Sequence, residues 1–239
     1  MSSRFVGKVV LVTGGTGGLG HAVSLAFLAE GATVAVTYQK ADEFERLKKD
    51  AGAGTPSLQG YAVDVTDEAA VHQLVDSILA HHERLDALVN TVGAYAGGMN
   101  LWEMDSKTLE RMLSLNLRVA YVLSRSVAPV MLKQKHGAIV NTCAKAAWDH
   151  GAGASAYAAS KAGALALMDS LAAEVKGSGV RVNSILPSII DTAANRNAMP
   201  GADFSKWPKP QDIAQVILFL CSDAAKVIHG AAIPVFGDS

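Results

Sequence analysis

The glycine-rich segment at residues 13–20, TGGTGGLG, constrains the fold of this chain more than any other feature. It follows a short β-branched run at 8–13 and opens a helical stretch at 19–30. A strand that leads through glycines into a helix gathers free backbone N–H groups and the positive end of the helix dipole. Glycines also let the backbone approach a pyrophosphate closely. The segment therefore predicts a dinucleotide-binding turn, the alternative being a plain glycine-rich turn.

Apolar, β-branched runs alternate with helical stretches along the whole sequence. Such alternation predicts right-handed βαβ crossovers and a doubly wound parallel sheet with helices on both faces. No repeat or linker divides the chain, so we predict one α/β domain over residues 1–239 with about seven strands. Residues 188–210 have no clear period and are expected to form a substrate loop. The predicted strands are 8–13, 33–38, 60–63, 87–90, 138–142, 180–186 and 232–236, and the predicted helices are 19–30, 42–51, 66–83, 106–133, 157–176 and 211–221.

Composition argues against several classes of function. With 21 Lys and Arg against 22 Asp and Glu, the chain has no basic excess that would bind nucleic acid. No run approaches the ~18 consecutive apolar residues of a membrane span, and residues 1–8 lack the apolar core of a signal peptide. The histidines show no metal-ligand spacing, and Cys143 and Cys221 form no disulfide framework. We therefore expect a cytoplasmic protein with no metal, no nucleic-acid partner and no membrane partner.

The residues after the second predicted strand bear on the choice between NAD and NADP. In dinucleotide-binding folds an acid at this place holds the ribose 2′-hydroxyl of NAD, whereas a cation accommodates the 2′-phosphate of NADP. Here the strand ends in Tyr38-Gln39-Lys40, without an acid. The sequence thus favours NADP(H), with Lys40 as the phosphate partner; the alternative is that Lys40 is a solvated surface lysine.

Tyr157 and Lys161 lie four residues apart in a predicted helix, on one face and within mutual reach. A phenol titrates near ~10, and a neighbouring cation favours the phenolate and lowers that pKa. Such a pair can exchange a proton with a substrate oxygen or nitrogen while a hydride moves to or from a nicotinamide. A tyrosine and a lysine on one helix are often only structural, but together with the glycine segment they indicate an oxidoreductase.

The combined motifs resemble those of the short-chain dehydrogenase/reductase family over nearly the whole chain. They comprise Thr13-Gly14, Gly18, Gly20, Asp64-Val65, Asn90-Thr91-Val92-Gly93, Asn116, Tyr157, Lys161 and the segment 187–192. The resemblance implies a Rossmann fold, a small-molecule substrate, and a homodimer or homotetramer formed through the predicted helices 106–133 and 157–176. It implies catalytic roles for Tyr157, Lys161 and Asn116, with Asn116 organising a proton-relay water. The implied cofactor contacts are Gly14, Gly15, Thr16, Gly17, Gly18, Leu19, Gly20, Tyr38, Gln39, Lys40, Asp64, Val65, Asn90, Gly93, Tyr157, Lys161, Pro187, Ile190 and Thr192.

One position departs from the family pattern. Many members carry a catalytic serine 13 residues before the tyrosine, and this chain has Ala144 there. Losing one oxyanion donor can cost a carbonyl reductase on the order of 10²–10³ in rate. Either the protein binds cofactor without turnover, or Ser155 or Thr142 replaces the missing hydroxyl, or the substrate does not need one.

Ala144 and the segments 94–98 and 191–207 also resemble quinonoid dihydropteridine reductases. Reduction of a quinonoid ring spreads charge over nitrogens, so one proton donor could suffice. The sequence therefore predicts an NAD(P)H-dependent reductase of a small-molecule C=N or C=O group, with Tyr95 and Ala144 in the substrate pocket. The alternatives are a 3-oxoacyl or general ketone reductase and, in another class, a catalytically impaired NAD(P)-binding regulator.

Overall fold

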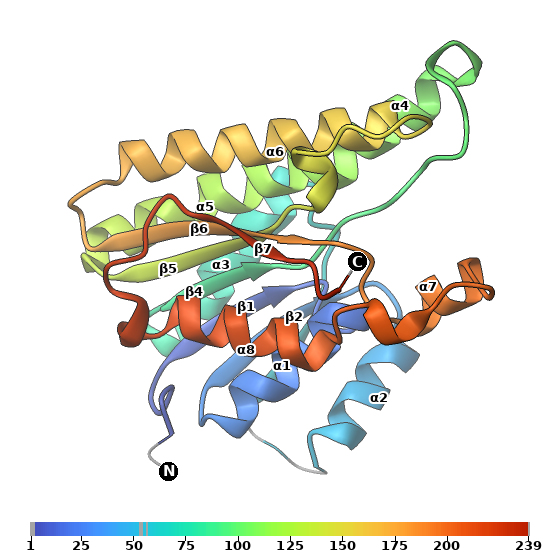
Figure 1. Cartoon of the computed structure of the whole chain (residues 1–239). Helices are drawn as coiled ribbons and strands as arrows, with labels where there is room; N and C mark the ends of the chain where they lie inside the picture. The colour runs from blue at the N-terminus through green and yellow to red at the C-terminus, as the bar shows by residue number, and fades with distance from the viewer. Residues whose placement is uncertain (1–2, 53–54, 56, 239) are drawn as a thin grey trace.

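A central parallel sheet organises the molecule, seen in a computed structural model that describes residues 3–52, 55 and 57–238. In these residues seven strands pair in the order β3-β2-β1-β4-β5-β6-β7, every pair parallel. The chain starts in the middle of the sheet, builds outward to β3, then crosses back to β4 beside β1 (Figure 1). The strands are β1 (Val9–Thr13), β2 (Thr33–Tyr38), β3 (Leu58–Ala62), β4 (Ala87–Asn90), β5 (Gly137–Thr142), β6 (Val180–Pro187) and β7 (Ala232–Val235).

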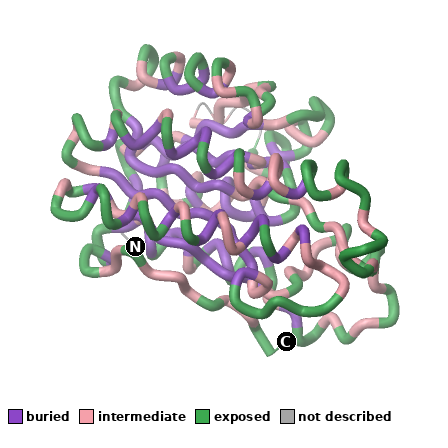
Figure 2. Tube along the Cα trace, turned by 90° about the horizontal axis from the view of Figure 1, so that it is seen from above, coloured by how far each residue is buried: buried purple, intermediate pink, exposed green. Residues whose placement is uncertain are grey.

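Helices cover both faces of this sheet (Figure 1). One core layer packs the sheet against α1 (Gly18–Ala29), α2 (Ala41–Asp50) and α8 (Pro210–Cys221). The other packs it against α3 (Glu68–His82), α5 (Val119–Gln134) and α6 (Ser155–Glu174). Figure 2 shows the buried residues concentrated between these outer helices. Burial on both faces explains why β1 and β4 are continuous apolar runs rather than alternating ones.

The predicted fold class is confirmed, and the predicted strands match the observed ones to within two residues at each end. One helix prediction was wrong. The expected continuous helix over 106–133 consists of α4 (Ser106–Met112), a π-helical segment η2 (Leu113–Arg118) and α5. Asn116 lies in that segment and forms hydrogen bonds with the backbone of the loop after β4. The helical period of the sequence does not reveal such a tertiary contact.

The loop at 188–210 also contains more regular structure than predicted. A short helix α7 (Ala193–Ala198) begins after Thr192, whose hydroxyl accepts a hydrogen bond from the Asn195 amide at 3.2 Å. A further turn, η4 (Phe204–Lys206), follows it. A helix of six residues is too short to give a clear period.

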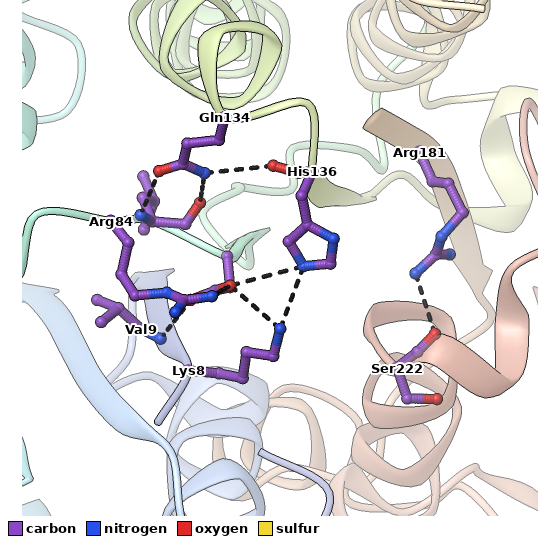
Figure 3. Close-up of polar contacts among 9 residues, drawn as sticks. Lys8, Val9, Arg84, Gln134, His136, Arg181 and Ser222 are labelled. Carbon is purple, nitrogen blue, oxygen red and sulfur yellow. Dashed lines mark hydrogen bonds and ion pairs between the residues drawn. The ribbon is translucent and has the colours of Figure 1, made fainter. Parts of the chain in front are cut away.

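A cluster of charged residues lies where β1, β4 and β5 begin. These amino ends of the strands are at the opposite end of the sheet from the glycine segment. Asp86 is 5% exposed and accepts hydrogen bonds from the backbone of Val9 at 2.9 Å and from Arg84 at 2.5 and 2.8 Å. Lys8 and His136 each approach the carboxylate to 3.5 Å (Figure 3). Burial raises the pKa of Asp86, but these hydrogen bonds outweigh it and the net pKa lies below the ordinary value.

Within the part of the chain that the structure describes, no helix combines the length and apolar character needed to cross a bilayer.

Candidate active site

The glycine segment forms a tight turn between β1 and α1. Gly14 has φ +69°, and its amide donates to the Thr37 hydroxyl at 3.0 Å, which ties the turn to β2. A Cβ on Gly20 would overlap the Gly14 carbonyl oxygen, so this glycine is needed for the close approach. The turn therefore has the tightness predicted for a phosphate cradle.

The N-terminus of α1 is open toward this turn. Gly17 is the N-cap residue and has no side chain, so no side-chain group caps the first-turn amides of α1. A Cβ on Gly17 would meet only the Gly14 carbonyl, at 3.4 Å. Uncapped amides and a positive dipole end suit a pyrophosphate. The chain thus fits the dinucleotide that the sequence implies.

The substrate loop reaches over the same turn. A Cβ on Gly18 would lie 2.7 Å from the Thr192 methyl carbon, so the two backbones approach closely only because residue 18 is glycine. Pro187 ends β6, and Ile190 packs against the core layer of α1 and α8. The loop therefore brings Thr192, one of the predicted contact residues, against the glycine turn.

The corner beyond β2 is more acidic than the sequence analysis allowed. Tyr38 is half-buried, and Gln39 and Lys40 are exposed. Lys40 does not stand alone, because its Nζ contacts Glu43 Oε1 at 3.0 Å. The predicted cofactor contacts after β2 end at Lys40 and so do not include Glu43. The sequence feature that could have indicated Glu43 is its position one helical turn after Lys40, where an acid can pair with the lysine.

Asp64 and Val65 follow β3, the neighbouring strand, and are the residues expected to meet the adenine ring. Asp64 is exposed, and its carboxylate accepts hydrogen bonds from the Thr66 amide at 2.9 Å and hydroxyl at 2.7 Å. These bonds lower its pKa. Val65 is buried in the core layer that packs against α3 and α5.

Tyr157 and Lys161 lie one helical turn apart in α6, and Lys161 reaches the carboxyl end of β5. Lys161 is 4% exposed, and its Nζ donates to the Thr142 carbonyl at 2.9 Å. Burial lowers the pKa of Lys161 to about 8. Burial raises the pKa of Tyr157 to about 12. The net pKa of the Tyr157 phenol therefore lies above its ordinary value, although Lys161 is one helical turn away, because desolvation dominates at the phenol.

Asn116 and Gly93 lie beside Lys161. The Asn116 amide accepts from the Ala94 N–H and donates to the Ala94 carbonyl, both at 2.9 Å, and donates to the Ser160 hydroxyl at 2.9 Å. A Cβ on Gly93 would lie 3.0 Å from both Asn116 Oδ1 and Lys161 Nζ. The π-helical segment, the β4 loop and α6 therefore meet at these polar groups.

The side chain of Asn90 forms hydrogen bonds between neighbouring strands of the sheet. Its amide oxygen accepts from the Thr13 hydroxyl at 2.9 Å, and its Nδ2 donates to Asn141 Oδ1 at 2.8 Å. Asn141 in turn donates to the Cys143 thiol at 3.3 Å. This buried chain links the carboxyl ends of β1, β4 and β5 and supports the turns that carry the site.

A cavity of about 540 Å³ opens beside Tyr157. Tyr95 packs its ring against that of Tyr157 at 5.0 Å in an edge-on arrangement and is 66% exposed. Ala144 is buried in the cavity wall. The remaining polar side chains of the cavity wall, which were not predicted, lie on the loop after β5 and on the substrate loop: Lys145, Asp149, Ser188 and Asn195.

Thr142 and Ser155 carry the two hydroxyls that are candidates to replace a serine at position 144. Thr142 and Ser155 both have buried hydroxyl oxygens without a hydrogen-bond partner among the described residues. Neither residue lines the cavity beside Tyr157. Neither Thr142 nor Ser155 therefore places a hydroxyl at the cavity wall in place of the serine of the family pattern.

Known proteins are similar to this chain in both sequence and architecture. Residues 8–202 match the profile of the short chain dehydrogenase family. A 3-oxoacyl-[acyl-carrier-protein] reductase of Thermotoga maritima is 32% identical over 242 residues, with 98% of each chain covered. A D-threitol dehydrogenase of Mycolicibacterium smegmatis is 35% identical over 98% of this chain and 93% of its own. The solved structure of ElxO with NADP bound has a TM-score of 0.90 at 26% identity, covering 96% of this chain and 97% of that one.

Proposed function

Because the chain belongs to the short chain dehydrogenase family and is an NAD(P)-dependent oxidoreductase, we propose that it reduces a C=N or C=O group of a small molecule. The proposal rests chiefly on the Tyr157 phenol at the wall of the 540 Å³ cavity, above the carboxyl ends of the strands. Its raised pKa keeps the phenol protonated at neutral pH, as a proton donor in reduction must be.

The three side chains have different roles in this scheme. A nicotinamide held at the glycine turn would supply the hydride. Tyr157 gives the proton from its hydroxyl to the substrate atom that gains negative charge. Lys161, cationic below pH ~8, stabilises the resulting phenolate and binds the nicotinamide ribose. Asn116 holds the β4 loop against α6 and anchors the proton relay.

The substrate class follows from Ala144. Without a hydroxyl at that position, a ketone oxyanion loses one donor, whereas a quinonoid dihydropterin spreads its charge over ring nitrogens. We therefore favour a dihydropteridine reductase-like substrate. The second candidate is a 3-oxoacyl or general ketone substrate, favoured by the 32% identical 3-oxoacyl reductase. Oxidation of NADPH and NADH with quinonoid dihydropterin and with an acetoacetyl thioester, assayed in parallel, distinguishes them. Cofactor binding without turnover of either substrate would favour a non-catalytic regulator.

Ala144→Ser tests the substrate class directly. We expect the variant to gain about 10²-fold in kcat/KM on the acetoacetyl thioester and to lose activity on quinonoid dihydropterin. Steady-state rates at the nicotinamide absorbance measure both effects. Ala146→Ser, another alanine of the same cavity, is the matched control and should leave both rates nearly unchanged. Unchanged rates on both substrates for Ala144→Ser would contradict the role given to Ala144.

For the cofactor we favour NADP(H), with Lys40 as the partner of the 2′-phosphate. A KM for NADH well below that for NADPH would overturn this preference.

We also propose a homodimer or homotetramer formed through α5 and α6. A groove of about 550 Å³ runs between these helices and is lined by apolar side chains that include Tyr121 and Leu132, 42% and 40% exposed. We expect Leu132→Glu to convert the assembly to monomers or dimers in light scattering. Val227→Glu, an exposed apolar position outside the groove, should leave the mass unchanged. A wild-type protein that is monomeric at micromolar concentration would contradict the proposal.

A further inference from the structure

Glu43 occupies the corner between the glycine turn and the candidate phosphate partner. Its Oε2 accepts a hydrogen bond from the hydroxyl of Thr16, a buried residue of the glycine segment, at 3.1 Å. Its Oε1 contacts Lys40 Nζ at 3.0 Å. One carboxylate therefore bridges the turn that should hold the pyrophosphate and the cation that should meet a 2′-phosphate.

Aromatic packing fixes the first turn of α2, and with it Glu43. The ring of Tyr38, the last residue of β2, stacks on Phe44 with centroids 4.8 Å apart and an interplanar angle of 1°. The Phe44 ring in turn fills the space over Gly60, where no Cβ could fit. The backbone next to Glu43 is thus held against β2 and β3, so its carboxylate is positioned by the fold.

A neighbouring ion pair shows what an ordinary surface contact looks like on the same helix. Lys48 and Glu45 form an i,i+3 pair at 2.6 Å, the same spacing as Lys40 and Glu43. The Glu45 side chain is 66% exposed, whereas that of Glu43 is 31% exposed. Of the two acids, Glu43 is the one whose bond to the glycine turn the structure records.

We propose that Glu43 is a specificity-determining residue that limits the preference for NADPH over NADH, an inference that rests on the proposed use of Lys40 as phosphate partner. A carboxylate in this corner can accept a hydrogen bond from the ribose 2′-hydroxyl of NADH. It repels the 2′-phosphate of NADPH and competes with it for Lys40. The acid that selects the ribose in this chain is thus delivered by the first turn of α2 instead of by the end of β2.

Direct binding of the two cofactors tests this role without a substrate. The purified wild-type protein, Glu43→Gln and Glu45→Gln are titrated with NADPH and, separately, with NADH, and nicotinamide fluorescence gives each Kd. We expect Glu43→Gln to tighten NADPH binding roughly 10-fold and to weaken NADH binding severalfold. Glu45→Gln should leave both Kd values within about twofold, because exposed pairs contribute little.

The possible results separate this inference from the proposed function. If the wild-type protein binds neither cofactor at millimolar concentration, the proposed function fails. If it binds them and Glu43→Gln leaves the ratio of the two Kd values unchanged, only the role of Glu43 fails. Lys40→Met provides a second variant: it should weaken NADPH binding alone, and an equal loss for both cofactors would overturn the competition for Lys40. Thermal melting of each variant identifies any that fails to fold.

Discussion

Replacing Tyr157 by phenylalanine is expected to lower kcat for reduction by about 10²–10⁴-fold, the usual contribution of a positioned proton donor. The variant keeps the aromatic ring that packs against Tyr95 at 5.0 Å, so the cavity wall should be preserved. The measurement is steady-state oxidation of NADPH with the better substrate of the parallel assay, together with cofactor binding by fluorescence. We expect binding to persist. Tyr61→Phe, which removes a phenol hydroxyl in β3, is the control and should retain full turnover.

The pH profile of the wild-type enzyme provides a second readout of the same pair. Tyr157, with a pKa of about 12, stays protonated through the neutral range. Lys161, with a pKa of about 8, loses its charge above that pH. We therefore expect kcat/KM for reduction to be level near pH 6–7 and to fall as the pH rises through about 8. A rate that stays constant to pH 10 would mean that the charge of Lys161 is not needed. A Tyr157→Phe variant with wild-type kcat would mean that the proton comes from another group.

The second large effect concerns stability. Asp86→Asn should lower the free energy of unfolding by about 3 kcal/mol, because it breaks a buried charge pair and leaves Arg84 without its carboxylate. Lys8 and Arg84 keep 29% and 45% of their side-chain surface exposed, so solvent screens part of the loss and the effect stays at the low end for buried pairs. Urea unfolding followed by circular dichroism measures the difference. Asp76→Asn, an exposed acid that contacts His72 at 3.7 Å, should cost less than about 0.5 kcal/mol.

The stabilisation by Asp86 should also depend on pH with a definite sign. The folded-state pKa of this carboxyl lies below its ordinary value of 3.8, so the unfolded chain binds the proton more readily. The contribution is complete above that value and is lost as the pH falls through the folded-state pKa. We expect the gap between the wild type and Asp86→Asn to be constant from pH 5 to 7 and to shrink below pH ~4. A gap that widens in acid would contradict this assignment.

Local pattern was enough to predict the sheet and the glycine turn. Parallel strands buried on both faces, such as β1 and β4, are mainly apolar along their length, so they can be recognised in the sequence. The turn needs glycine at positions 14 and 20 for steric reasons, and these glycines are visible in the sequence. The π-helical segment at Asn116 was not predictable, because it follows from contacts with Ala94 and Ser160, which are distant in sequence.

Electrostatic properties of the site escaped sequence analysis for a related reason. The spacing of Tyr157 and Lys161 placed both on one helix face, but the raised pKa of Tyr157 comes mainly from burial, which no spacing reports. Glu43 was overlooked although it lies only three residues after Lys40. Its importance arises from Thr16, which the fold brings to it from another segment.

The contact between Thr192 and Gly18 has a consequence for the order of events in a catalytic cycle. One segment, 188–199, both crosses the glycine turn through Thr192 and lines the cavity beside Tyr157 through Ser188, Ile189 and Asn195. Residues of this one segment therefore contact both the turn expected to hold the dinucleotide and the cavity expected to hold the substrate. We expect compulsory-order kinetics, in which the dinucleotide binds first and dissociates last. Dissociation of the dinucleotide should then limit kcat.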